Sequence, residues 1–191
     1  MDFHTLCIGC RTYRRFKQKQ IPEEILDELL ENARIANSAM NGQPLRYVLV
    51  KTSEAVRKIQ PCFHFAAALP KELGQPKEGE QPAAFIILCT EGPETPWTGI
   101  DIGIAVRTMN LNAYIHGVGS CIIGNVEFEK VKEILSIPET WIPRLALALG
   151  YPSHKSTIVE LPEDGSVKYY LDEERQYYVP KRKRKDISII R

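Results

Sequence analysis

The pattern of apolar and polar positions predicts a helix, a loop and two strands in the first half of the chain. Residues 22–36 place Ile25, Leu29, Leu30 and Ala33 on one helical stripe. A proline at the first helical position and two glutamates in the first turn suit a helix start, because the helix dipole favours negative charge there. A loop of small and amide residues and two strands follow, at residues 37–44, 47–50 and 83–89. The strand at residues 83–89 is apolar throughout and is therefore expected at the centre of its sheet.

In the second half of the chain, residues 100–115 form the longest predicted helix, with apolar side chains on every face. Such a helix is expected to be buried nearly all round and is a candidate for a subunit interface. A strand, a helix and a last core strand follow, at residues 120–123, 127–135 and 145–149. The polar segment 72–81 is expected to be an exposed connection or a mobile lid.

Composition indicates one folded domain over residues 1–191, with no internal repeat. With 43% hydrophobic and 26% charged residues, the chain can bury a substantial core. Its net charge of +1 gives no general attraction to nucleic acid or to anionic membrane. The longest uncharged run lies between Arg107 and Glu127 and contains several polar residues, so no membrane span is expected.

The five cysteines indicate reduced thiols in the cytoplasm, because the chain shows no secretory leader. Cys7 and Cys10 form a Cys-x-x-Cys pair, but a usual zinc site needs two further ligands at comparable spacing. A redox dithiol is a second interpretation, in which Arg11 and Arg14 lower the pKa of the Cys10 thiol. Ordinary reduced cysteines are the favoured interpretation.

Three arginines and a threonine lie within residues 11–16, just before the first helix. Guanidinium groups can chelate two oxygens of a phosphate, and a threonine hydroxyl can add a hydrogen bond. A solvated basic surface is the alternative. The amide-rich loop at residues 37–43 offers donors and acceptors that suit a ligand with a heterocyclic edge. The standard nucleotide and zinc motifs are absent from the sequence.

The last part of the chain differs from the rest in composition. Tyr169, Tyr170, Tyr177 and Tyr178 flank a charged turn, and a basic run at residues 181–185 follows Pro180. We expect this arm, about residues 169–191, to cover another surface instead of packing on itself. An alternative interpretation is that the chain is a non-enzymatic binding protein, which uses the arm to bind nucleic acid or a protein partner. The balanced charge of the whole chain disfavours that alternative.

Four blocks of sequence together resemble the FMN-dependent nitroreductase family. They are Arg11-Thr12-x-Arg14, residues 36–44 (Ala-Asn-Ser-Ala-Met-Asn-x-Gln-Pro), residues 117–124 (Gly-Val-Gly-Ser-Cys-Ile-Ile-Gly) and residues 149–152 (Leu-Gly-Tyr-Pro). Their order and spacing match the family. The resemblance implies an α+β fold with a mixed β-sheet between helices. It also implies a homodimer that binds FMN in a groove between its subunits, with the C-terminal arm wrapping the partner.

The resemblance assigns the FMN phosphate to Arg11, Thr12 and Arg14, helped by Lys181 or Arg182 of the arm. Four residues of the amide-rich loop would approach the flavin ring from the partner subunit: Asn37, Ser38, Asn41 and Gln43. Ile123 and Gly124 match positions whose backbone N–H groups lie near the reactive edge of the flavin. Three positions depart from the family pattern: Cys10 is usually basic, Asn37 usually proline and Ala39 usually serine.

The activity that the resemblance implies is hydride transfer from NADH or NADPH to FMN and then to a second substrate. Nitroaromatics, quinones and similar small electron acceptors are the expected class. Because the flavin carries the reaction, no catalytic side chain is assigned, and none of the four histidines has a catalytic context. An oxygen-dependent flavin-fragmenting enzyme and a dehalogenase are alternatives within the family.

Overall fold

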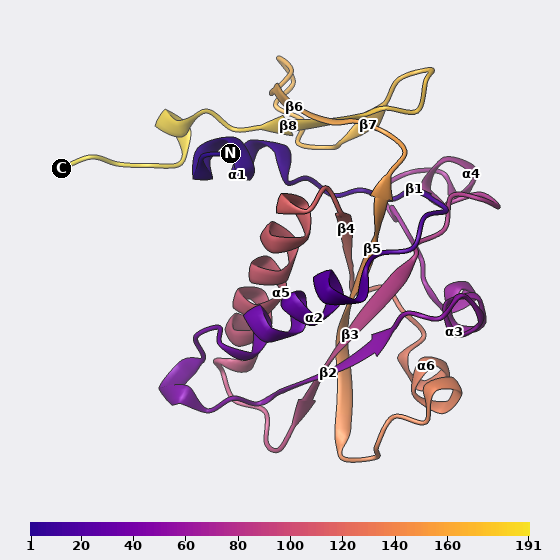
Figure 1. Cartoon of the computed structure of the whole chain (residues 1–191). Helices are drawn as coiled ribbons and strands as arrows, with labels where there is room; N and C mark the ends of the chain where they lie inside the picture. Colours follow the sequence, from indigo (N-terminus) through magenta and orange to yellow (C-terminus); the bar gives the residue numbers. More distant parts are fainter.

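A five-stranded antiparallel sheet forms the centre of the fold (Figure 1). The computed structural model describes residues 1–191, apart from the side chain of Lys71. The strands are β1 (Phe16–Lys17), β2 (Leu45–Val50), β3 (Ala84–Glu91), β4 (Gly119–Ile123) and β5 (Trp141–Pro152). β5 pairs with β3 along one side and with β4 and β1 along the other, and β2 lies beyond β3. The predicted strands are confirmed, and β5 extends well beyond the predicted 145–149.

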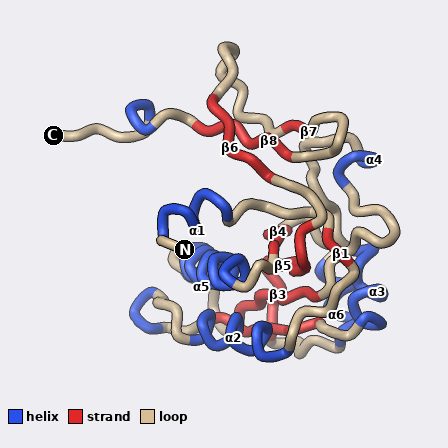
Figure 2. The backbone as a smooth tube through the Cα atoms, turned by 45° about the horizontal axis from the view of Figure 1, so that its top comes forward, coloured by secondary structure: helices blue, strands red, loops and turns tan.

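Helices cover both faces of this sheet. The side chains of each strand alternate between the two faces, so a wholly apolar strand presents apolar side chains on both. Ile86 and Leu88 of β3 pack toward one face, and Phe85 and Ile87 of the same strand toward the other. The first face carries α2 (Glu23–Arg34) and α5 (Thr98–Ile115); the second carries α3 (Ser53–Ile59), the 3-10 helix η2 (Gln60–Cys62) and α6 (Phe128–Leu135). Figures 1 and 2 show the sheet between these helices, which confirms the α+β class.

The long helix α5 is buried on one side only, so the prediction of burial nearly all round is wrong for the single chain. Val106, Met109 and Ala113 are buried toward α2 and the sheet. The opposite side is apolar but exposed. Its members, which we call the α5 apolar face, are Trp97, Ile100, Ile104 and Ile115, with exposed fractions of 51%, 52%, 37% and 57%. The chain therefore leaves an apolar helix face without a covering element of its own.

The C-terminal region forms a second, three-stranded sheet above the first (Figure 1). Its strands are β6 (Ser156–Glu160), β7 (Tyr170–Leu171) and β8 (Tyr177–Lys181). β6 and β8 pair in parallel, and β7 pairs antiparallel with β8. β7 and β8 of the arm pair with each other and Tyr177 is completely buried, so the expectation that the arm does not pack on itself is wrong as far as β8. Only the exposed residues beyond Lys181 extend away from the body.

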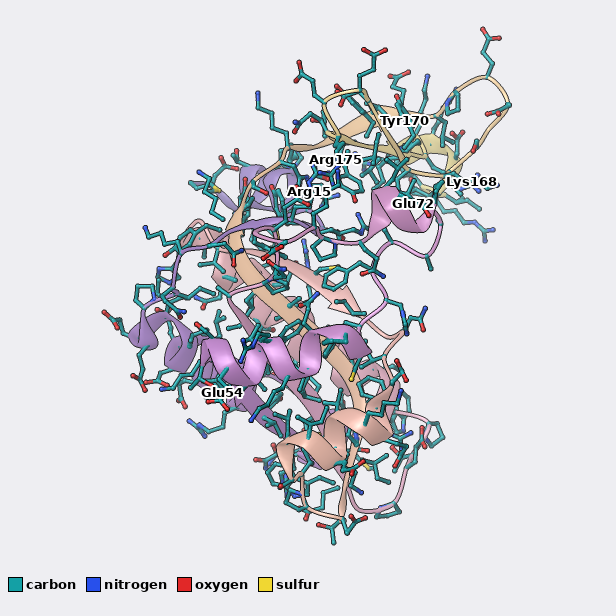
Figure 3. The ribbon with its side chains drawn as sticks, turned by 90° about the vertical axis from the view of Figure 1, so that its right-hand side faces the viewer. Arg15, Glu54, Glu72, Lys168, Tyr170 and Arg175 are labelled. Atoms are coloured by element: carbon teal, nitrogen blue, oxygen red, sulfur yellow. The ribbon has the colours of Figure 1, made fainter. Side chains whose placement is uncertain are left out.

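The predicted lid region is fastened to the second sheet. Glu80 accepts two hydrogen bonds from the Arg175 guanidinium, at 2.8 and 3.2 Å, and lies 3.9 Å from the buried Arg15. Figure 3 shows Arg15 and Arg175 close together where the second sheet meets the body. The predicted segment, residues 72–81, is therefore a connection anchored at Glu80. The remaining short helices are α1 (Phe3–Gly9), η1 (Ala39–Asn41), α4 (Lys71–Gly74) and η3 (Arg184–Asp186). Within the described residues, no helix is both long enough and apolar enough to cross a bilayer.

Candidate functional site

The segment after α1 lies against the free edge of β4. Thr12 forms a parallel bridge with Ser120, and the Tyr13 N–H donates to the Ser120 carbonyl at 2.9 Å. Between this segment, α5 and the end of β8 lies a cavity of about 170 Å³, which we call the basic cavity. Its lining residues are Cys10, Arg11, Thr12, Arg107, Asn110, Ser120, Ile122, Val179 and Lys181.

Three cationic side chains reach the basic cavity from different parts of the chain. Arg11 follows α1, Arg107 lies on α5 and Lys181 ends β8. None of the described lining residues is acidic, so the cavity favours an anion. Of the predicted phosphate ligands, the structure brings Arg11, Thr12 and Lys181 together here. Arg182 is exposed and does not line the cavity.

Arg14 points away from the basic cavity and toward the second sheet. Its guanidinium carbon lies 4.6 Å from the ring centroid of Tyr169 and 4.9 Å from that of Tyr177. A guanidinium over an aromatic face is attracted by the ring quadrupole. Arg14 therefore joins the N-terminal segment to the arm, and its role as a phosphate ligand stays a prediction.

His154 holds the backbone of Arg14 in place. Its Nε2 accepts a hydrogen bond from the Arg14 N–H at 3.0 Å, so the ring proton lies on Nδ1, which donates to the Lys155 carbonyl at 2.9 Å. Burial lowers the pKa of His154 from 6.5 to about 4, because the imidazolium would lose its hydration, and Arg15 and Arg14 add repulsion. The histidine is therefore neutral in the folded protein at neutral pH.

This depressed pKa predicts a loss of stability in mild acid. Between pH 6.5 and about pH 4 the unfolded chain binds a proton at His154 that the folded chain does not bind, so the free energy of unfolding falls as the pH falls. Lowering the pH across this whole window reduces the free energy of unfolding by about 3 kcal/mol. Urea unfolding of the wild type and His154→Gln across this window measures it. An equally steep pH dependence in both proteins would contradict the assignment.

The amide loop, residues 37–43, is held in a compact conformation around η1. Met40, Asn41 and Gln43 have positive φ values of 50°, 54° and 48°, a region that costs energy for residues other than glycine. The Ser38 hydroxyl accepts a hydrogen bond from the Gln43 N–H at 3.1 Å and closes the loop. Met40 projects from its tip and is 91% exposed. Such a strained, exposed loop is typical of a binding surface.

A second cavity, of about 150 Å³, lies beside the amide loop, and its lining includes Asn37, Ser38 and Gln43. Asp101 of α5 also lines it and is 4% exposed. Its carboxylate accepts a hydrogen bond from the Ala39 N–H at 2.9 Å. Asp101 therefore fixes the loop to the N-terminal part of α5.

The predicted cofactor residues fall into two groups in the single chain. The basic cavity and the cavity beside the amide loop share no lining residue, although α5 contributes to both. Asn41 is exposed and lines neither cavity. At the end of β4, Ile123 is buried in the core, and Gly124 is exposed at the surface. A ligand that contacts both groups would need surface from more than one cavity.

The Cys-x-x-Cys pair does not contain an activated thiol at Cys10. Burial raises the pKa of this thiol, and Arg107 and Arg11 oppose that effect only in part. The alternative interpretation of an activated redox thiol at Cys10 is therefore not supported, because Arg11 lowers this pKa by less than burial raises it. The thiol donates a hydrogen bond to Asn110 Oδ1 at 2.9 Å. All five cysteines are free, and the described residues contain no cluster of ligands that could hold a metal ion.

Four residues that organise these sites were missed from the sequence: Asp101, Arg107, Asn110 and His154. Asp101 and Arg107 are the two charged residues of the largely apolar helix α5, and Asn110 is one of its few other polar residues, so their presence there was an available signal. His154 lies in a polar turn that gives no indication of its burial.

Comparison with known proteins identifies the class to which this fold belongs. A protein from Streptococcus pneumoniae, described as a nitroreductase family protein, superposes with a TM-score of 0.69 and 19% identity, covering 87% of this chain and 99% of that one. The fold is therefore nitroreductase-like. The model of the nitroreductase family matches residues 9–151. The chain belongs to the nitroreductase family.

Two relatives of this chain have names that describe an enzymatic activity. A protein of Methanothermobacter thermautotrophicus, provisionally named NADH dehydrogenase/NAD(P)H nitroreductase, is 29% identical over 75% of this chain and 73% of its own length. A Bacillus subtilis protein named FMN reductase [NAD(P)H] is 26% identical over 76% of this chain and 64% of its own length. Both names describe oxidoreductases.

Proposed function

We propose that the protein is an FMN-dependent NAD(P)H oxidoreductase that reduces nitroaromatic, quinone or similar small electron acceptors. The observation that carries the proposal is the basic cavity, in a chain of the nitroreductase family. Bound FMN would supply the hydride-accepting and hydride-donating chemistry, so that NADH or NADPH and the acceptor react in turn at one place. The chain's own residues would bind and orient the reactants, and no catalytic side chain is required.

The donor set of the basic cavity fits the phosphate end of FMN. Arg11 and Lys181 supply positive charge, and the Thr12 hydroxyl supplies a hydrogen bond. The volume of about 170 Å³ is smaller than the roughly 300–1,000 Å³ of cavities that enclose a whole small ligand. The cavity therefore suits a terminal phosphate group, and the flavin ring would lie on another surface.

We propose that this other surface is completed in a homodimer. The α5 apolar face is an expected site of association, because contiguous exposed apolar surface marks interfaces. In that dimer, Asn37, Ser38, Asn41 and Gln43 of one subunit would approach the flavin ring held by the other. The backbone at Ile123 and Gly124 would lie near the reactive edge, where an N–H donor stabilises developing negative charge.

The first test is cofactor binding. Apoprotein titrated with FMN is expected to bind about one FMN per subunit and to gain absorbance near about 450 nm. Bound flavin should be reduced by NADH or NADPH without oxygen and reoxidised by a quinone or a nitroaromatic. Arg11→Gln is expected to weaken FMN binding by up to about tenfold, because part of the positive charge that faces the phosphate is lost. Wild-type apoprotein that ignores micromolar FMN would refute the proposed function.

A reducing compartment suits this protein, because all five of its cysteines are free. We therefore propose the cytoplasm as its location.

A further inference from the structure

We infer that Arg107 of α5 is the principal guanidinium ligand for the phosphate group bound in the basic cavity, in place of a basic side chain at position 10. The inference rests on the proposed function, since the phosphate is taken to be that of FMN. It concerns a residue that no sequence motif identified, and it follows from four features of the cavity.

The first feature is the neutral thiol of Cys10. Its raised pKa keeps it protonated at neutral pH, so position 10 gives no positive charge to the cavity. The thiol is 2% exposed and donates to Asn110. The Nη1 group of Arg107 lies 3.5 Å from its sulfur, which places a permanent positive charge directly beside the uncharged position.

The second feature is the rigid support of the Arg107 guanidinium. Its Nη1 donates to Asn110 Oδ1 at 2.5 Å, one helical turn further along α5. Asn110 is itself 5% exposed and is fixed at its other end, where its Nδ2 donates to the Ser120 hydroxyl of β4. Arg107 therefore enters the cavity already oriented, which reduces the entropy lost on binding.

The third feature is the number of unused donors. Arg11 is largely committed to the protein, because its Nε and Nη2 donate to the carbonyls of Cys10 and Cys7 at 3.0 and 2.7 Å. Among the described residues, Nε and Nη2 of Arg107 have no hydrogen-bond partner, and they are not buried. A guanidinium binds two phosphate oxygens through a pair of adjacent N–H groups, and Arg107 retains such a pair.

The fourth feature is the absence of competing negative charge. Within the described part of the chain, neither Arg107, Arg11 nor Lys181 forms an ion pair with a carboxylate. By contrast, Arg15, Arg46, Arg144 and Arg175 all do. An anion entering the cavity therefore meets cations that no protein carboxylate neutralises.

The test compares FMN with riboflavin, which lacks the phosphate, in binding titrations of apoprotein. Arg107→Gln is expected to weaken FMN binding roughly tenfold to a hundredfold, the range for lost hydrogen bonds to a charged group, and to leave riboflavin binding unchanged. Arg107→Lys should retain part of the affinity. The matched control is Arg57→Gln, which removes the same charge from the exposed surface of α3. This control should bind both ligands as the wild type does.

Two results would overturn the inference while leaving the proposed function in place. One is an Arg107→Gln protein that binds FMN like the wild type. The other is equal weakening of FMN and riboflavin binding, which would indicate a structural role for Arg107. If the wild type binds no FMN, the proposed function fails, and inorganic phosphate becomes the probe. Phosphate should then raise the unfolding temperature of the wild type more than that of Arg107→Gln; equal shifts would overturn the inference.

Discussion

Ile104→Asp is expected to convert the proposed dimer to a monomer of 21.7 kDa. Ile104 lies in the middle of the α5 apolar face, where an interface would bury its side chain. An unpaired carboxylate at that position would lose its hydration on association without gaining a partner, so the dimer dissociation constant should rise at least about a hundredfold. Sedimentation or light scattering at micromolar concentration measures the change. The variant should also lose flavin, if the amide loop acts across the interface.

The control is Ile134→Asp on α6, which covers the opposite face of the sheet. Ile134 is 41% exposed and Ile104 is 37% exposed, so the two substitutions are similar in the isolated chain. The α6 variant should stay dimeric and keep its flavin. A wild-type protein that is a stable monomer, or an Ile104→Asp protein that remains dimeric, would refute the proposed interface and the flavin site shared between subunits.

Tyr177→Ala is expected to lower the free energy of unfolding by about 3–5 kcal/mol, the range for removing a fully buried aromatic side chain. Tyr177 has no exposed surface and contacts both the Arg14 guanidinium and the His154 ring, at centroid distances of 4.9 and 4.7 Å. The matched control is Tyr178→Ala, at the neighbouring half-buried position. Denaturant unfolding should separate the two variants. Similar losses in both would show that Tyr177 does not anchor the arm.

Truncation divides the arm into a structural part and a tail. Removal of residues 177–191 deletes β8 with Val179 and Lys181, so it should destabilise the fold and release flavin. Removal of residues 183–191 leaves β8 intact and should not change the stability of the single chain, because those residues are exposed. If the shorter truncation still loosens the dimer, the tail contacts the partner. If the longer truncation keeps full stability and flavin, β8 is dispensable.

Local signals predicted the elements of the fold well. The apolar stripe and the charge pattern of residues 22–36 predicted α2, which is observed as Glu23–Arg34. This prediction succeeded because one side of the helix packs against the adjacent core, as an apolar stripe indicates. The apolar run that predicted β3 also placed it correctly inside the sheet. The burial of α5 and the packing of the arm were predicted wrongly. Both depend on which distant surfaces are available, and composition alone does not specify them.

The candidate site was predictable only where the residues stand close together in the sequence. The segment after α1 and the amide loop were both singled out, and each contributes to a cavity. The residues that support them were missed because their partners are far away along the chain. The Asp101 contact spans 62 positions, and the His154 contact spans 140. Tertiary pairings of this kind are set by packing of whole elements, which a local pattern does not reveal.

The helix α5 sets the spacing between the two halves of the site. Asp101 holds the amide loop, and Arg107 reaches the basic cavity six residues later, about 9 Å further along the axis. A single inserted residue between them would rotate one side chain by about 100° relative to the other. Substitutions in this stretch can therefore change side-chain chemistry, but changes in its length would uncouple loop and cavity. Through its rigid geometry, one helix connects the basic cavity, the amide loop and the apolar face proposed for association.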